Sequence, residues 1–131
     1  MATDYKTGKV RAAEGVVIGG GKVLQPALYA LALEKLFPEA TVEAGRLWYC
    51  THTGSYTEVL VQLDARTRAS AGLAIKTVGD ALAQGFFPAA PAEGECDWCD
   101  YREICGDGEE QRAARKPPEP LLPLRALRSE P

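Results

Sequence analysis

The N-terminal run Asp4-Tyr5-Lys6 places an acid and a base two residues apart. On an extended strand alternate side chains point to the same face, so we expect the carboxylate of Asp4 beside the ammonium of Lys6. Phosphodiester hydrolysis needs a hard cation held by oxygen ligands, a positioned water and positive charge near the reacting phosphate. Asp4 suits the metal and Lys6 suits the other two tasks, although an exposed ion pair near a strand end is the preferred interpretation of the triplet when it is taken alone.

A second polar pair, Gln25 and Tyr29, follows in a segment rich in helix formers. Pro26 fits the first turn of such a helix, and the pair then shares one helical face. Leucines on nearly all other sides predict a helix packed into a core. Taken without the N-terminal triplet, Gln25 is interpreted as the first residue of the helix and Tyr29 as a buried aromatic residue whose hydroxyl is hydrogen-bonded. Taken together with the triplet, both are candidate site residues.

Three cysteines, Cys96, Cys99 and Cys105, lie close together further along the chain. Thiolates two residues apart can reach one metal ion or cluster, whereas a disulfide framework usually needs an even set and a secreted protein. The remaining thiol, Cys50, falls on a predicted strand, where a free cysteine acts as a small apolar residue. If Cys50 reached the loop, a four-cysteine zinc site would rival an iron-sulfur cluster. Either metal would have a structural role.

Patterning predicts the elements that carry these residues. Alternation, helix formers and turn residues give a strand over 2–5, a helix over 23–37, a hairpin of 46–50 and 57–63, and a helix over 65–84. Asp64 can cap the last helix and Gly85 ends it. Its expected apolar stripe consists of Ala71, Ile75, Val78 and Leu82.

The end of the chain, residues 108–131, turns to Glu, Arg, Lys and Pro without core periodicity. This composition predicts a disordered tail. Its four leucines offer the alternative of docking on a partner such as a helicase subunit.

The whole chain has 131 residues, of which 46% are hydrophobic and 25% charged, and no apolar run that would cross a bilayer. We expect one small cytoplasmic unit without a membrane partner. A net charge of -3 is unlike that of a free-standing nucleic-acid binder, so DNA affinity would have to be local. The candidates for that local charge are Lys6, Lys9, Arg11 and Lys22.

These motifs together resemble the PD-(D/E)XK nuclease superfamily, specifically its RecB-like and AddB-like branch, which is found with helicases in recombination and repair. In that branch a strand often ends in Asp-Tyr-Lys-Thr-Gly and a Q-x-x-x-Y helix follows, as at residues 4–8 and 25–29 here. The resemblance covers about residues 2–107. It implies an α/β fold with a mixed sheet flanked by helices, and a partial nuclease domain over 1–107 that includes a cysteine loop at 96–105.

The resemblance also implies a role for each matched residue. Asp4 is the ligand of Mg²⁺ or Mn²⁺, Lys6 positions water and stabilises charge, and Gln25 and Tyr29 contact the site and the DNA, with Lys9 as a further DNA contact. A [4Fe-4S] cluster, or Zn²⁺ as the alternative, is bound by Cys96, Cys99 and Cys105.

The family pattern has an earlier helix and strand with another acidic ligand and a first cluster cysteine, whereas only three residues precede Asp4 here. We therefore expect the C-terminal part of a metal-dependent DNA nuclease acting in double-strand-break repair and recombination, with a fused or separate helicase and little catalysis by this chain alone. Two alternatives stay open: a non-catalytic, metal-stapled module that binds DNA or protein, and a structural zinc protein unrelated to nucleases.

Overall fold

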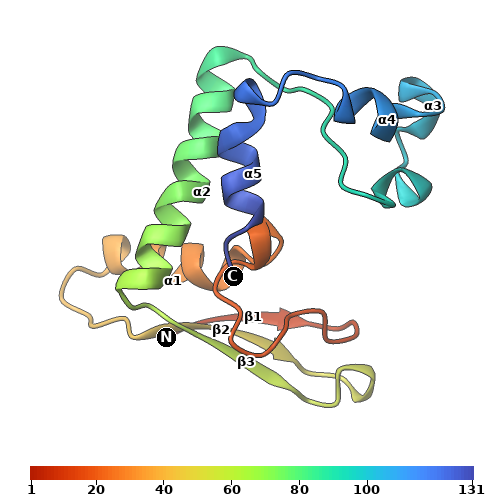
Figure 1. Cartoon of the computed structure of the whole chain (residues 1–131). Helices are drawn as coiled ribbons and strands as arrows, with labels where there is room; N and C mark the ends of the chain where they lie inside the picture. Colours follow the sequence, from red (N-terminus) through yellow and green to blue (C-terminus); the bar gives the residue numbers. More distant parts are fainter.

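The computed structural model describes residues 1–131, and its sheet has three strands in the order β1 (Ala2–Lys6), β2 (Ala44–Tyr49) and β3 (Glu58–Gln62). β1 pairs parallel to β2, and β2 pairs antiparallel to β3. A parallel pair needs a crossover, and the helix between β1 and β2 provides it. The predicted α/β fold with a mixed sheet and flanking helices is confirmed (Figure 1).

The crossover helix α1 (Gln25–Leu36) packs on all three strands. Its first turn approaches β2 closely because Gly45 has no side chain: a Cβ there would lie 2.0 Å from the carbonyl oxygen of Pro26. The prediction of burial on nearly all sides was wrong, since Leu36 and Phe37 are 72% and 56% exposed. The close contact instead buries the small residues of the helix, Pro26, Ala27 and Ala30.

The long helix α2 (Ala65–Gln84) begins and ends as the sequence predicts. The Asp64 carboxylate accepts a hydrogen bond from the Thr67 N–H at 2.8 Å, and Gly85 takes a left-handed conformation after the last turn. The predicted apolar stripe was wrong beyond Ala71, because Ile75, Val78 and Leu82 are at least half exposed. The buried face consists of Thr67, Ser70, Ala71 and Ala74, whose small side chains let neighbouring helices approach.

The C-terminal segment is folded, which corrects the prediction of a disordered tail over 108–131. It contains α4 (Glu109–Ala114), a short 3₁₀ turn (Glu119–Leu121) and α5 (Leu122–Arg128). Figure 1 shows α5 lying along α2. Leu127 is buried in the same apolar cluster as Ile18 and Ala71, so the leucines make a core contact that a charge-rich composition conceals.

The backbone ties this segment down as well. The N–H groups of Val17, Ile18 and Gly19 all donate to the main-chain oxygen of Pro131, at 3.1, 2.6 and 2.9 Å. These bonds fix the 3₁₀ turn Gly19–Gly21, which leads directly into Lys22 and α1. The C-terminal segment therefore supports the start of α1.

Residues 94–116, the cysteine module, project from the body at the end of an extended arm (Figure 1). The module contains a 3₁₀ turn (Glu95–Trp98), α3 (Arg102–Cys105) and α4. None of the helices of the chain combines the length and apolar character needed to cross a bilayer.

A basic cavity beside Asp4 and Lys6

Asp4 and Lys6 lie on the face of β1 that the helices cover. They stand opposite Leu47 and Tyr49 of β2, which are 2% and 5% exposed. The Lys6 ammonium lies 2.8 Å from Oδ2 of Asp4, and the two side chains are 32% and 18% exposed. The strand geometry thus brings the predicted acid and base together.

This ion pair leaves one polar atom without a hydrogen bond. Oδ2 of Asp4 is buried and accepts none, because its contact with Lys6 lacks the angles of a hydrogen bond. The Lys6 ammonium balances the charge of this oxygen without a well-aligned hydrogen bond, and a carboxylate oxygen is the kind of ligand that a hard cation takes. The carboxylate of Asp4 is therefore the group of this site best suited to hold a hard metal ion.

A cavity of about 330 Å³ opens next to the pair, between the end of β1, the following loop and the start of α1. Its lining includes Gln25 and the ring of Tyr49, whose hydroxyl accepts a hydrogen bond from the Arg11 N–H at 3.4 Å. No acidic residue lines it. Its four basic residues, which create a positive field suited to phosphate, are Lys6, Lys9, Arg11 and Lys22.

The structure brings most, but not all, of the predicted site residues together. Lys6, Lys9 and Gln25 share the cavity, and Asp4 adjoins it through its contact with Lys6. Tyr29, one helical turn further along α1, is 49% exposed and is not part of the lining. Sequence reasoning missed Tyr49, although its alternation with Leu47 on a strand marks it as facing the same side as Lys6.

The cysteines of the module are near one another but do not form a closed ligand set. Burial raises the pKa of the Cys96 thiol, and the negative charge of Glu110 and the neighbouring Cys99 and Cys105 raise it further. No group of three or more His, Cys, Asp or Glu side chains in the chain is placed to hold one metal ion. As arranged, these side chains therefore do not form a closed site for a single metal ion such as zinc. Cys50 lies after β2 and its thiol contacts the carbonyl oxygen of Lys6 at 3.6 Å.

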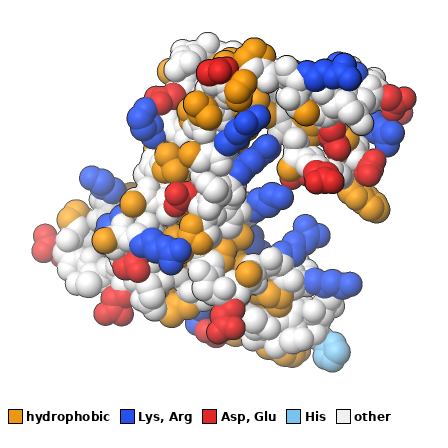
Figure 2. All heavy atoms as spheres, in the orientation of Figure 1, with side chains coloured by type: hydrophobic (Ala, Val, Ile, Leu, Met, Phe, Trp, Pro, Cys, Tyr) orange, Lys and Arg blue, Asp and Glu red, His pale blue; other side chains and the backbone are white.

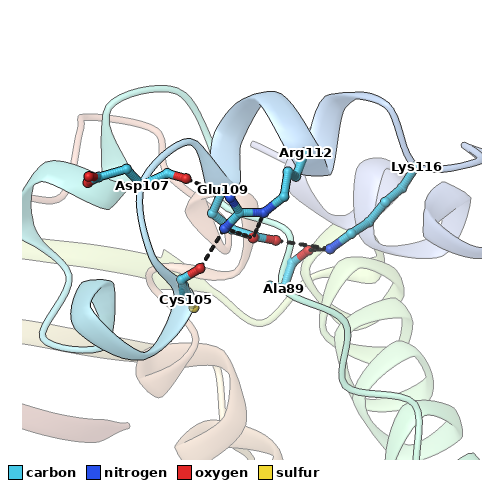
Figure 3. A network of polar contacts seen from close by, with 6 residues as sticks. All are labelled: Ala89, Cys105, Asp107, Glu109, Arg112 and Lys116. Atoms are coloured by element: carbon cyan, nitrogen blue, oxygen red, sulfur yellow. Dashed lines mark hydrogen bonds and ion pairs between the residues drawn. The ribbon is translucent and has the colours of Figure 1, made fainter.

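Charged hydrogen bonds hold the module together (Figure 3). The Glu109 carboxylate accepts bonds from Arg112 at 2.8 Å and Lys116 at 3.1 Å, which lower its pKa, Lys116 having the larger effect. Arg112 also donates to the carbonyl oxygen of Cys105 at 2.5 Å, and Lys116 to that of Ala89 in the arm at 2.8 Å. Glu109 thereby links the cysteine loop to the arm.

Comparison with known proteins identifies a family for this chain. Residues 2–106 match a family model described as the PD-(D/E)XK nuclease superfamily. The match includes the ion pair, the basic cavity and the cysteine loop, and it ends before α4 and α5. Neither the curated proteins nor the solved structures gave a match.

Proposed function

The chain belongs to the PD-(D/E)XK nuclease superfamily, and on this premise we propose that Asp4, Lys6 and Gln25 form part of a metal-dependent site for hydrolysis of DNA phosphodiester bonds. The observation that carries the proposal is the Asp4–Lys6 pair beside a cavity with four basic and no acidic lining residues. Such a cavity attracts the phosphate of a DNA strand and holds it next to the carboxylate.

Each residue has a proposed task. Asp4 binds Mg²⁺ or Mn²⁺, which when bound polarises the phosphate and makes water more acidic. One carboxylate is too few for a tight site, so the other ligands would be water, phosphate oxygens or an acid outside residues 1–131. Lys6 balances the negative charge that gathers on the phosphate, and Gln25 orients a phosphate oxygen or the attacking water. Lys9 contacts the DNA backbone, and Tyr29 meets the DNA outside the cavity.

The test is cleavage of linear single-stranded and double-stranded DNA with Mg²⁺ or Mn²⁺, using the gene product that carries this chain. Asp4→Ala and Lys6→Ala should each lower the rate by about a hundredfold or more, because each removes charge that acts in the transition state. Glu39→Gln is the matched control, since Glu39 is exposed and lies away from the cavity. Undiminished cleavage by both site variants, with circular dichroism showing folded protein, would remove the assignment.

We also propose that the chain is of the RecB-like or AddB-like type and works with a helicase in repair and recombination. The support is sequence spacing, namely Asp-Tyr-Lys-Thr-Gly at 4–8 and the three thiols of the module. As placed, the three thiols do not form a site for a single metal ion, so binding of zinc would require the loop to rearrange. Anaerobic purification followed by absorbance and iron and zinc analysis tests this, and a folded protein with neither metal would refute it.

A second candidate is a DNA-binding module without catalysis. The observation that favours it is the ammonium of Lys6 at 2.8 Å from Asp4, where a metal would have to bind. This function predicts DNA binding that is unaffected by a chelator, together with no cleavage under any metal. The same cleavage assay therefore separates the two candidates.

A further inference from the structure

Tyr49 lines the site cavity but has no task in the proposed hydrolysis. It is the last residue of β2, stands opposite Lys6 in the parallel pair and is only 5% exposed. Its ring packs with Ala12 and Leu47 in a small apolar cluster. On another side, the turn after β2 lies so close that a Cβ at Gly54 would be 2.6 Å from the Cβ of Tyr49. The ring is therefore held in one position at the wall of the cavity.

The Tyr49 hydroxyl has a proton that the chain does not use. Its oxygen accepts a hydrogen bond from the Arg11 N–H at 3.4 Å, and the hydroxyl donates none. A phenol hydroxyl can accept and donate at once, and buried donors are nearly always paired. Accepting the bond from Arg11 also polarises the hydroxyl, which strengthens the bond that it can donate. Because both residues line the cavity, Tyr49 offers a donor to a molecule that enters there.

The charge of the cavity favours one class of molecule. No acid lines it, and Lys9 and Arg11 form no ion pair, so the wall keeps a positive charge. Lys6 and Lys22 are paired with acids that lie outside the lining. Lys22 bonds Glu95 of the cysteine module, and Figure 2 shows Lys and Arg side chains gathered in the hollow between the body and this module. An anion with oxygen acceptors, such as a phosphate group, matches both the charge and the donor.

We propose that the Tyr49 hydroxyl donates a hydrogen bond to a non-bridging oxygen of the phosphate that is cleaved, and that this bond strengthens as negative charge gathers on that oxygen. This role rests on the proposed function, since it adds a residue to that site. The proton stays on the tyrosine oxygen, so Tyr49 stabilises charge and takes no part in proton transfer. Its place opposite Lys6 sets a neutral donor and a cation on neighbouring strands, where they act on one phosphate.

The test is cleavage of linear DNA by Tyr49→Phe, which keeps the ring and removes only the hydroxyl. The gene product that carries this chain is used with Mg²⁺ or Mn²⁺, and kcat and KM are measured separately. We expect kcat to fall about tenfold to a hundredfold and KM to change by less than about twofold, because the lost bond acts mainly in the transition state. The matched control is Tyr5→Phe, which removes the same group from a residue that is 61% exposed on the opposite face of β1. This control should cleave as the unaltered protein does.

A second measurement separates this role from a purely structural one, since Tyr49→Phe also removes the acceptor of the Arg11 N–H. It uses oligonucleotides whose phosphates all carry sulfur, a weak acceptor, in one of the two stereochemical positions. For one stereoisomer, the loss of rate caused by sulfur should be about tenfold smaller in Tyr49→Phe than in the unaltered protein, because the contact is already absent. A loosened loop would instead lower the rate for oxygen and sulfur substrates by the same factor.

Equal sulfur effects in the two proteins for both stereoisomers, or undiminished cleavage by Tyr49→Phe, would refute the role of Tyr49. If Asp4→Ala still abolishes cleavage in that case, the proposed function stands and this role alone falls. Undiminished cleavage by Asp4→Ala and Lys6→Ala, or no cleavage by the unaltered protein, would remove the site and the role of Tyr49 with it.

Discussion

The body and the cysteine module are stabilised in different ways. The body buries apolar side chains between the sheet, α1, α2 and α5, with Ile18, Ala30 and Ala71 fully enclosed. In the module Ala113 is the single buried residue, and Trp98 and Ile104 are 90% and 82% exposed. Its contacts are charged hydrogen bonds between Glu109, whose side chain is 12% exposed, and Arg112, whose side chain is 47% exposed (Figure 3).

This difference separates a rigid site from a weakly held one. Apolar burial fixes a backbone strongly, so the body can hold a carboxylate and an ammonium 2.8 Å apart. The module buries a single apolar residue, so it is the part whose arrangement a bound ligand or partner changes most easily. The proposed metal cluster would therefore supply the constraint that the module lacks.

The largest effect should come from the closest packing in the body. In Gly45→Ala the new Cβ would lie 2.0 Å from the carbonyl oxygen of Pro26, so β2 and α1 must move apart. We expect a loss of about 3 kcal/mol or more in the free energy of unfolding, at the upper end for overpacking. Urea denaturation followed by circular dichroism measures it.

Gly79→Ala is the control for this substitution. Gly79 lies inside α2 and a Cβ there meets nothing within 4 Å. The change should stabilise the protein by about 0.5–1 kcal/mol, because alanine favours a helix over glycine. Similar effects at the two glycines would show that α1 does not pack on β2 as described.

A smaller loss should follow from removing the anchor of α5. Leu127 is 6% exposed within the main apolar cluster, so Leu127→Ala should cost about 2–4 kcal/mol by urea denaturation. Leu122→Ala, on the same helix but 55% exposed, should change stability by less than about 0.5 kcal/mol. If the segment were a disordered tail, the two substitutions would have equally small effects.

The sequence predicts the body well where one local rule decides the outcome. The bounds of α2 follow from a capping aspartate, Asp64, and a terminating Gly85, and the Asp4–Lys6 contact follows from strand alternation. Both depend on residues within a few positions of one another. Packing between residues far apart in the sequence cannot be predicted from such local rules. It determined which faces were buried in the elements for which the sequence prediction was wrong.

Two such failures have a common physical origin. Ile75, Val78 and Leu82 form a convincing apolar stripe, yet α2 buries its small residues because α1 and α5 approach on that side. The fold of residues 108–131 likewise depends on Leu127 reaching Ile18, more than a hundred positions earlier in the chain. Periodicity within a segment does not show which of two apolar faces a distant partner will cover.

The smallest effect, and the one that isolates the module, is expected in mild acid. The pKa of Glu109 is held below its ordinary 4.5, chiefly by Lys116 and then by Arg112. Because the pKa of Glu109 is lower in the folded protein, the ionised carboxylate stabilises the folded module at pH values above 4.5. This stabilisation is lost as the pH falls through the lowered pKa of the folded state. Amide signals of residues 105–116 in NMR spectra should therefore shift below pH 4.5, while those of the buried Ala27 and Leu47 in the body should not.

Substitution at Glu109 assigns this transition. Glu109→Gln keeps an acceptor but removes the charge, so the module should show its acid spectrum already at neutral pH and lose the pH step. Glu103→Gln is the control, because Glu103 is exposed and forms no ion pair with Lys or Arg. The body also has carboxylates with lowered pKa, Glu34 and Asp64, but its apolar core remains when they are protonated. A step that persists in Glu109→Gln, or that appears in body and module together, would mean that both regions are held by the same interactions.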